Sequence, residues 1–218
     1  MTIDFHFDFL SPYAYIAWTQ LHALAARHGA QVRAIPTLLA ALLAHGNTRG
    51  PAEIPAKRVY VFVDTLRSAR HLGVPLAPPP AHPFNPLLAL RAAAIVDDRD
   101  QQRRLIDHLY AATWGGGGGC DTVEKVQAAA SAAGLDGAAL VQRAQSAEAK
   151  QRFKQHTDDA IAAGVFGVPT MRTGEGPACF FFGFDAFGAL ERHLSGHENI
   201  VDDDILRWQQ LPATSSRL

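Results

Sequence analysis

The sequence predicts an α/β domain that carries a large all-helical insertion, and three patterns support that prediction. The chain opens with a strand pattern, a helix pattern and a second strand pattern in close succession. Residues 38–163 then carry almost no strand pattern and are rich in Ala, Leu, Arg and Gln, which indicates an inserted helical domain. Strand patterns return only after this stretch, so residues 1–37 and 164–218 are expected to form one α/β domain.

The opening β-α-β unit is marked residue by residue. Residues 3–9 alternate apolar and polar side chains, which is the period of a strand with one buried face. Ser11 is a suitable N-cap, and Pro12 stands at the first helical position, where its missing N–H costs nothing. The helix is expected to end at Gly29, and residues 31–36 are a second strand that a right-handed crossover makes parallel to the first.

Helical patterns fill the insertion between breaks that are rich in proline or glycine. The predicted helices span 55–72, 86–97, 99–113, 122–132, 136–144 and 147–163. The glycine run at 115–119 resembles a phosphate-binding loop only superficially. It lacks the downstream Lys-Ser/Thr of a P-loop and the strand–helix setting of a dinucleotide fingerprint, so we predict a plain loop there.

The last part of the chain returns to strands. Residues 168–172 and 178–182 have strand character and flank the turn-forming segment 173–177, which predicts a hairpin. A helix from about 185 to 194 follows, then an acid-rich link at 202–204 and a C-terminal helix.

Composition limits the functions that are open to this chain. Its 218 residues are 48% hydrophobic and 19% charged, which is ordinary for a globular enzyme. The net charge of −1 gives no long-range field for nucleic acid or anionic lipid, and no apolar run is long enough for a membrane helix. The first residues lack the basic start and apolar stretch of a signal peptide, so we expect a cytoplasmic protein. The final tripeptide 216–218 resembles a peroxisomal address, but the Ala/Arg/Gly/Pro-rich composition favours a bacterial cytosol.

The two cysteines, Cys120 and Cys179, belong to neither a CxxC motif nor a metal-spaced cluster. Reduced thiols are therefore expected, although a disulfide in a secreted chain would fit the count. The ten histidines are scattered singly, so we expect no metal site.

Two segments far apart in the sequence suggest chemistry. Ser11 stands between a strand and a helix, and the positive end of that helix favours an anion that the hydroxyl could contact. Pro169 stands at the start of a late strand, where a cis Val168–Pro169 bond would let Val168 offer its backbone to an extended peptide ligand. Taken separately, Ser11 is adequately explained as an N-cap and Pro169 as a trans proline of an edge strand.

The two segments together resemble the DsbA-like branch of the thioredoxin superfamily, in which a helical domain is inserted into a thioredoxin fold. Within that branch, residues 4–15 resemble the opening of 2-hydroxychromene-2-carboxylate isomerases, whose close relatives are the kappa-class glutathione transferases. The resemblance covers nearly the whole chain. It includes Phe166–Thr170, Gly183–Asp185, Trp114-Gly115 and the Pro83–Arg91 segment that leads into a helix.

The resemblance implies a glutathione site built around Ser11. Redox relatives carry CxxC where this chain reads Ser11-Pro12-Tyr13-Ala14, so dithiol–disulfide exchange is not expected there. Instead, Ser11 would stabilise the thiolate of glutathione, while Val168, beside Pro169, pairs with the cysteinyl backbone.

The resemblance also assigns roles outside the Ser11 helix. Phe184 and Asp185 would hold the γ-glutamyl end, although Asp185 equally suits an N-cap of the 185–194 helix. Lys57 and Asn85 would face the substrate or the glycine end of glutathione, although Lys57 also suits a solvated helix face.

The activity implied by the resemblance is a glutathione-dependent isomerisation. It interconverts 2-hydroxychromene-2-carboxylate and trans-o-hydroxybenzylidenepyruvate, a step of aromatic-hydrocarbon degradation, and relatives lead us to expect a homodimer. Two alternatives remain open: a kappa-like glutathione transferase, and a non-catalytic thioredoxin-fold protein that binds a peptide or a partner. A DsbA-like oxidoreductase fits the sequence least well because the CxxC motif is missing.

Overall fold

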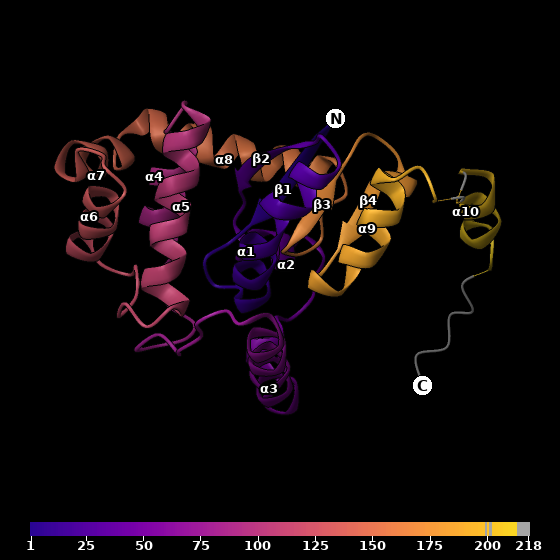
Figure 1. Cartoon of the computed structure of the whole chain (residues 1–218), viewed down its shortest axis with the longest axis horizontal. Coiled ribbons are helices and arrows are strands. Elements are labelled where there is room, and N and C mark those ends of the chain that lie inside the picture. The colour runs from indigo at the N-terminus through magenta and orange to yellow at the C-terminus, as the bar shows by residue number, and fades with distance from the viewer. Residues whose placement is uncertain (199, 201, 213–218) are drawn as a thin grey trace.

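The computed structural model describes residues 1–198, 200 and 202–212 and contains one mixed four-stranded sheet (Figure 1). The spatial order is β2-β1-β3-β4, in which β1 and β2 are parallel and the other two pairs are antiparallel. The strands are β1 (Thr2–Phe7), β2 (Gln31–Pro36), β3 (Thr170–Arg172) and β4 (Phe180–Phe182). The parallel first pair and the late hairpin are as predicted from the sequence.

Six helices lie between β2 and β3 close to their predicted bounds, with one addition before them. These are α3 (Pro55–Leu72), α4 (Leu87–Ala94), α5 (Arg99–Trp114), α6 (Val123–Ala132), α7 (Gly137–Ala144) and α8 (Ala147–Ala162). The addition is α2 (Leu39–His45), whose N-cap Leu38 makes no side-chain hydrogen bond. Helix α4 ends at Ala94, earlier than predicted, and α5 begins at Arg99 as predicted, where Asp98 accepts from Gln101 N (2.8 Å).

Three further helices lie outside the segment between β2 and β3: α1 (Pro12–Arg27), α9 (Phe187–Leu194) and α10 (Asp202–Gln209), of which α10 lies beyond α9, away from the sheet (Figure 1). A 3-10 turn, η3 (Phe184–Ala186), leads into α9. The acid-rich segment at 202–204, predicted as a link, is the first turn of α10, where the helix dipole favours carboxylates. The terminal tripeptide at 216–218 lies outside the described residues.

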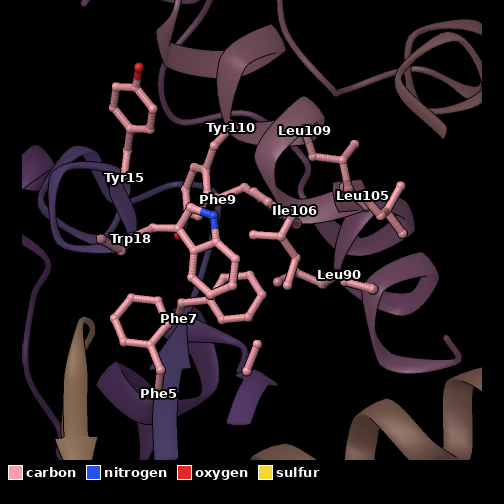
Figure 2. Packing of buried hydrophobic residues seen from close by; sticks show 14 of the residues in the cluster. Phe5, Phe7, Phe9, Tyr15, Trp18, Leu90, Leu105, Ile106, Leu109 and Tyr110 are labelled. Carbon is pink, nitrogen blue, oxygen red and sulfur yellow. The ribbon is translucent and has the colours of Figure 1, made fainter. Parts of the chain in front are cut away.

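One face of the sheet is covered by buried aromatic side chains. Phe5 and Phe7 of β1 are fully buried and pack against Trp18 of α1, and Tyr110 of α5 closes over Phe7 and Phe9 (Figure 2). We call this side the aromatic face; it carries the side chains of Ile3, Phe5, Phe7, Met171 and Phe181.

The opposite side, here called the polar face, carries Asp4, His6, Arg33, Thr170 and Arg172. The register aligns Arg33, Asp4 and Arg172 in one row across β2, β1 and β3, and His6 opposes Thr170 in the next. Helix α8 packs against β2 and α2, and a small cluster of Leu42, Ala160, Val165 and Val168 fills the end of this layer.

Both cysteines are free thiols, as predicted. Cys120 is buried in the loop after α5, where its sulfur accepts from the Thr113 hydroxyl (3.1 Å). Burial raises the pKa of Cys120 to about 12, so this thiol is inert at neutral pH. No helix among the described residues is long and apolar enough to cross a membrane.

Candidate functional site

Ser11 occupies the turn between β1 and α1 and has an extended backbone there. Its Oγ accepts from Ala14 N (3.1 Å), so the residue is the N-cap of α1, and Pro12 fills the first helical position. The residue is 7% exposed, and its own N–H donates to Asp8 O (3.0 Å). The hydroxyl is thereby held at the positive end of a 16-residue helix, where anions are stabilised.

The Val168–Pro169 segment lies against Ser11 although the two are far apart in sequence. The Val168–Pro169 peptide is cis, as predicted. The Ser11 hydroxyl donates to Val168 O over 3.4 Å, a long hydrogen bond that another acceptor can replace. The Val168 N–H has no acceptor among the described residues, so it can donate to the backbone of a ligand.

The loop that carries Phe184 and Asp185 is tied to the cis-proline segment. Gly183 N donates to Pro169 O (2.9 Å), and two residues later Asp185 stands exposed in η3. Gly183 has φ +87° and ψ +162°, a backbone conformation that strongly favours glycine. Phe184 is half-buried and packs against Phe187 (5.2 Å between ring centroids).

The alternative role of Asp185 as a helix cap is wrong. The N-cap of α9 is Ala186, and no side chain caps that helix. The Asp185 carboxylate has no hydrogen-bond or ion-pair partner in the part of the chain that the structure describes. It therefore remains open to a cationic ligand group.

Tyr13 is a site residue that the sequence analysis missed. Its hydroxyl donates to Asp64 Oδ2 of α3 (2.8 Å), which ties the start of α1 to that helix. Burial, the bond to Asp64 and the nearby Tyr60 and Asp185 all raise the pKa of Tyr13, so it remains a neutral donor. No local pattern signals this contact because 51 positions separate the two residues.

Asp8 is a second residue that the sequence analysis missed. It is fully buried, and its two carboxylate oxygens accept from Leu10 N (3.0 Å) and Leu39 N (2.9 Å). Burial raises the pKa of Asp8 to about 6, although the two N–H donors oppose that shift. Asp8 thus fixes the turn before Ser11 and carries a carboxyl group that titrates near neutrality.

His82 and Trp114 support the same turn from the helical part of the chain. The carbonyl of Leu10 can only accept, so His82 Nε2 carries the proton and donates to it (2.9 Å). Trp114 Nε1 donates to Phe9 O (2.8 Å). The His82 and Trp114 rings pack against each other, with 5.6 Å between their centroids. Both carbonyls just before Ser11 are therefore satisfied by inserted residues.

The structure does not join Lys57 or Asn85 to Ser11 by any contact among the described residues. Lys57 is exposed in the first turn of α3, which projects from the body of the molecule (Figure 1). The Asn85 side-chain oxygen accepts from Leu87 N (3.0 Å) at the start of α4, so half of its amide is engaged.

Comparison with known proteins places this geometry in a class. Residues 2–195 match the family model of the DSBA-like thioredoxin domain. The chain is 31% identical to 2-hydroxychromene-2-carboxylate isomerase of Sphingobium xenophagum, with 88% of this chain and 97% of that protein covered. It is 32% identical to the enzyme of that name from Pseudomonas putida, with 80% and 86% covered.

A solved structure of 2-hydroxychromene-2-carboxylate isomerase superposes with a TM-score of 0.80 at 28% identity, covering 98% of this chain and all of that one. Glutathione S-transferase kappa 1 of Caenorhabditis elegans is 24% identical, with 92% and 93% covered. The chain belongs to the 2-hydroxychromene-2-carboxylate isomerase family of DsbA-like thioredoxin-fold proteins.

Proposed function

We propose that the protein is a cytoplasmic, glutathione-dependent isomerase that interconverts 2-hydroxychromene-2-carboxylate and trans-o-hydroxybenzylidenepyruvate. The observation that carries the proposal is the Ser11 hydroxyl 3.4 Å from Val168 O, beside an unpaired Val168 N–H. A hydroxyl donor and an open backbone segment suit the thiol and the peptide backbone of one ligand. The isomerase relatives and the kappa transferases support the choice of glutathione as that ligand.

Ser11 has the task of holding the sulfur as a thiolate. A free thiol with a pKa near 8.5 is only a few per cent ionised at neutral pH. Each tenfold gain in thiolate fraction needs about 1.4 kcal/mol of preferential binding. On thiolate binding, the Ser11 proton turns from its long bond with Val168 O to the sulfur, while Ala14 N still donates to Oγ.

The groups around Ser11 suit the other parts of glutathione. Val168 pairs through its N–H with the cysteinyl backbone beside Pro169. The γ-glutamyl ammonium lies between Asp185, near Phe184, and Asp64, two carboxylates that border Tyr13. Lys57 and Asn85 are assigned to the glycine carboxylate or to the carboxylate of the aromatic substrate.

The isomerisation then needs no strong base. The thiolate adds to the alkene carbon conjugated with the keto group of the ring-opened substrate; a C–S bond forms, and the π pair moves onto the keto group as an enolate, so the former double bond becomes single. After rotation, the enolate pair returns and restores the double bond in the trans geometry, while the C–S bond breaks and its electron pair leaves with the sulfur as thiolate. Glutathione is recovered unchanged, and the protein is expected to act as a homodimer.

The test is a spectrophotometric assay with 2-hydroxychromene-2-carboxylate, with and without glutathione. Turnover should require glutathione, and Ser11→Ala should lower kcat by about 10²–10³ because one donor to an anion is lost. Ser146→Ala is the matched control, since Ser146 caps α8 in the same way, by accepting from Ala149 N (3.1 Å), without facing the site. Wild-type turnover in Ser11→Ala would show that another group stabilises the thiolate.

The kappa transferase relatives favour a second candidate, in which the thiolate adds to an electrophile and stays attached. Product analysis of the same reaction separates the two, because an isomerase regenerates free glutathione and a transferase consumes it. Saturable glutathione binding without turnover on any electrophile would instead favour a binding protein.

A further inference from the structure

A cavity of about 370 Å³ lies on the polar face of the sheet, away from the Ser11 site. Neither Ser11, Val168, Pro169 nor Asp185 lines it. Its floor is the row of Arg33, Asp4 and Arg172 together with His6, and α8 forms one wall with Arg152, His156 and Asp159. Its size is at the lower end of the range for small-molecule pockets, which begins at about 300 Å³.

Three buried nitrogen atoms of this cavity have no hydrogen-bond partner among the described residues: His6 Nε2, His156 Nδ1 and Arg172 Nε. His6 lines the cavity and is only 4% exposed, and of its two ring nitrogens Nε2 is the one without a partner. Buried polar groups are normally paired because leaving one without a partner costs about 1–3 kcal/mol. Three such atoms around one cavity indicate a ligand with several polar atoms.

The hydrogen-bond network around His6 fixes what that ligand must offer. The Thr37 hydroxyl donates to Ile35 O (3.0 Å), so its oxygen can only accept from His6 Nδ1–H (3.3 Å). Burial lowers the pKa of His6 to about 4, so at neutral pH the ring is neutral and Nε2 is an acceptor. Arg172 Nε is a donor. A ligand that satisfies both carries an O–H group beside an anionic oxygen.

The charges of the cavity favour an anion. Four arginines line it against three aspartates: Arg33, Arg99, Arg152 and Arg172 against Asp4, Asp97 and Asp159. Asp4 and Asp97 are neutralised by ion pairs with Arg33 (2.5 Å) and Arg152 (2.7 Å).

The three remaining charged groups of the lining, Arg99, Arg172 and Asp159, form no ion pair among the described residues. Arg99 and Arg172 have no carboxylate partner in the described residues; they donate to Gln31 (2.9 Å) and to Gly174 O (3.2 Å). Asp159 opposes an anion, but its carboxylate is exposed and accepts from Gln155 (2.7 Å). Two free guanidinium groups against one solvated carboxylate leave the cavity cationic.

We propose that this cavity is a binding site for inorganic phosphate, with its P–OH donating to His6 and its anionic oxygens bonded to Arg172. Inorganic phosphate keeps at least one proton at neutral pH and so presents donor and acceptor oxygens on one centre, whereas a phosphate monoester, with a second pKa of about 6, is mostly an unprotonated dianion. Sulfate has the same size and shape but carries no proton, so it cannot donate to His6. The site is independent of the Ser11 chemistry.

The test is calorimetric titration of the purified protein at pH 7 and constant ionic strength with sodium phosphate, sodium sulfate and glycerol 3-phosphate. Phosphate should bind saturably and about tenfold or more tightly than sulfate, because only phosphate satisfies His6. Glycerol 3-phosphate, which is mostly a dianion without a P–OH group at pH 7, should bind more weakly than inorganic phosphate, and tighter binding would overturn the assignment to inorganic phosphate. Equal affinity for phosphate and sulfate would overturn the proposal, as would the lack of saturable binding.

Two variants locate the binding. Arg172→Gln should weaken phosphate binding about tenfold or more, whereas Arg67→Gln, an exposed arginine of α3, should leave it unchanged. The imidazole resonances of His6 in long-range ¹H–¹⁵N spectra should shift on phosphate addition in the wild type. Unchanged affinity in Arg172→Gln, or unshifted His6 resonances at saturation, would show that phosphate binds elsewhere.

Discussion

The two faces of the sheet differ in what holds them to the helices above them. The aromatic face is closed by rings: Phe5, Phe7 and Phe9 interlock with Trp18 and Tyr110 at centroid distances of 4.9–6.5 Å. The polar face meets α8 through arginine, histidine and aspartate and leaves a cavity between them. Strand β1 contributes to both faces, because its alternate side chains point to opposite sides of the sheet.

This contrast has a physical consequence. Apolar burial is non-directional and independent of pH, so the aromatic face contributes stability under all mild conditions. Buried titratable groups contribute stability that depends on pH and on ligands. We therefore expect substitutions on the aromatic face to lower the free energy of unfolding by a similar amount at every pH. Substitutions on the polar face should change how the free energy of unfolding depends on pH and on ligand concentration.

The largest effect is expected from Phe7→Ala on the aromatic face. It removes a fully buried ring that contacts Trp18 and Tyr110, so the free energy of unfolding should fall by about 3–5 kcal/mol. Phe182→Ala is the matched control on the edge strand, where the ring is 45% exposed and the loss should be much smaller. Urea denaturation at neutral pH measures both, and equal losses would contradict the assignment of the core to the aromatic face.

His6 should make stability depend on pH. Its pKa is lowered by burial from 6.5 to about 4, so the folded protein favours the neutral ring. The resulting stability of about 3 kcal/mol is fully present above pH 6.5 and is lost as the pH falls towards 4. His6→Gln should flatten urea-derived stability over this window, although His22, with a pKa also lowered to about 4, retains part of the slope.

The control for His6 is His45→Gln, an exposed histidine at the end of α2. It should leave the pH profile of stability unchanged. A slope that His6→Gln leaves intact would mean that the His6 ring charges freely in the folded protein.

Asp8 should act in the opposite direction over a neighbouring window. Its pKa is raised by burial from 3.8 to about 6, so the folded protein binds this proton more tightly than the unfolded chain does. The stability contributed by the protonated form is complete below pH 3.8 and is lost as the pH rises through 6. A ¹³C titration of the Asp8 carboxyl should give a midpoint near 6; a midpoint below 4 would mean that the Leu10 and Leu39 donors outweigh burial.

The smallest effect on stability is expected at Ser11, which belongs to neither face. Ser11→Ala removes an N-cap and should cost about 1 kcal/mol, as should Ser146→Ala at the start of α8. Thermal or urea unfolding of both variants measures this. A much larger loss at Ser11 would show that its bond with Val168 O holds the fold together, and reduced activity could then not be assigned to chemistry alone.

The helices of this protein could be predicted well because their start signals are local. Asp98, Asp136 and Ser146 each stand immediately before a helix and accept from a backbone N–H three residues later. Helix α2 has no such residue, and its first N–H group, Leu39 N, donates instead to Asp8 (2.9 Å), a contact across 31 positions that no local pattern reveals.

The residues of the candidate site also fall into those that a local sequence pattern predicts and those that only long-range contacts reveal. Ser11 and Pro169 stand out because serine-proline and valine-proline turns are visible in a few consecutive residues. The pairing of Tyr13 with Asp64, and that of Asp8 with Leu39, join positions 51 and 31 residues apart. No local pattern encodes them, since each depends on where α2 and α3 pack.

The sequence by itself therefore determined the order of strands and helices and the serine cap at the start of α1. Only the tertiary structure decided which of these residues meet. It placed Ser11 against Val168, desolvated Asp8 and His6 enough to move their pKa values, and opened the cavity beneath α8. The physical reason is that caps and alternation act within a few residues, whereas burial and charge pairing depend on neighbours that the chain supplies from elsewhere.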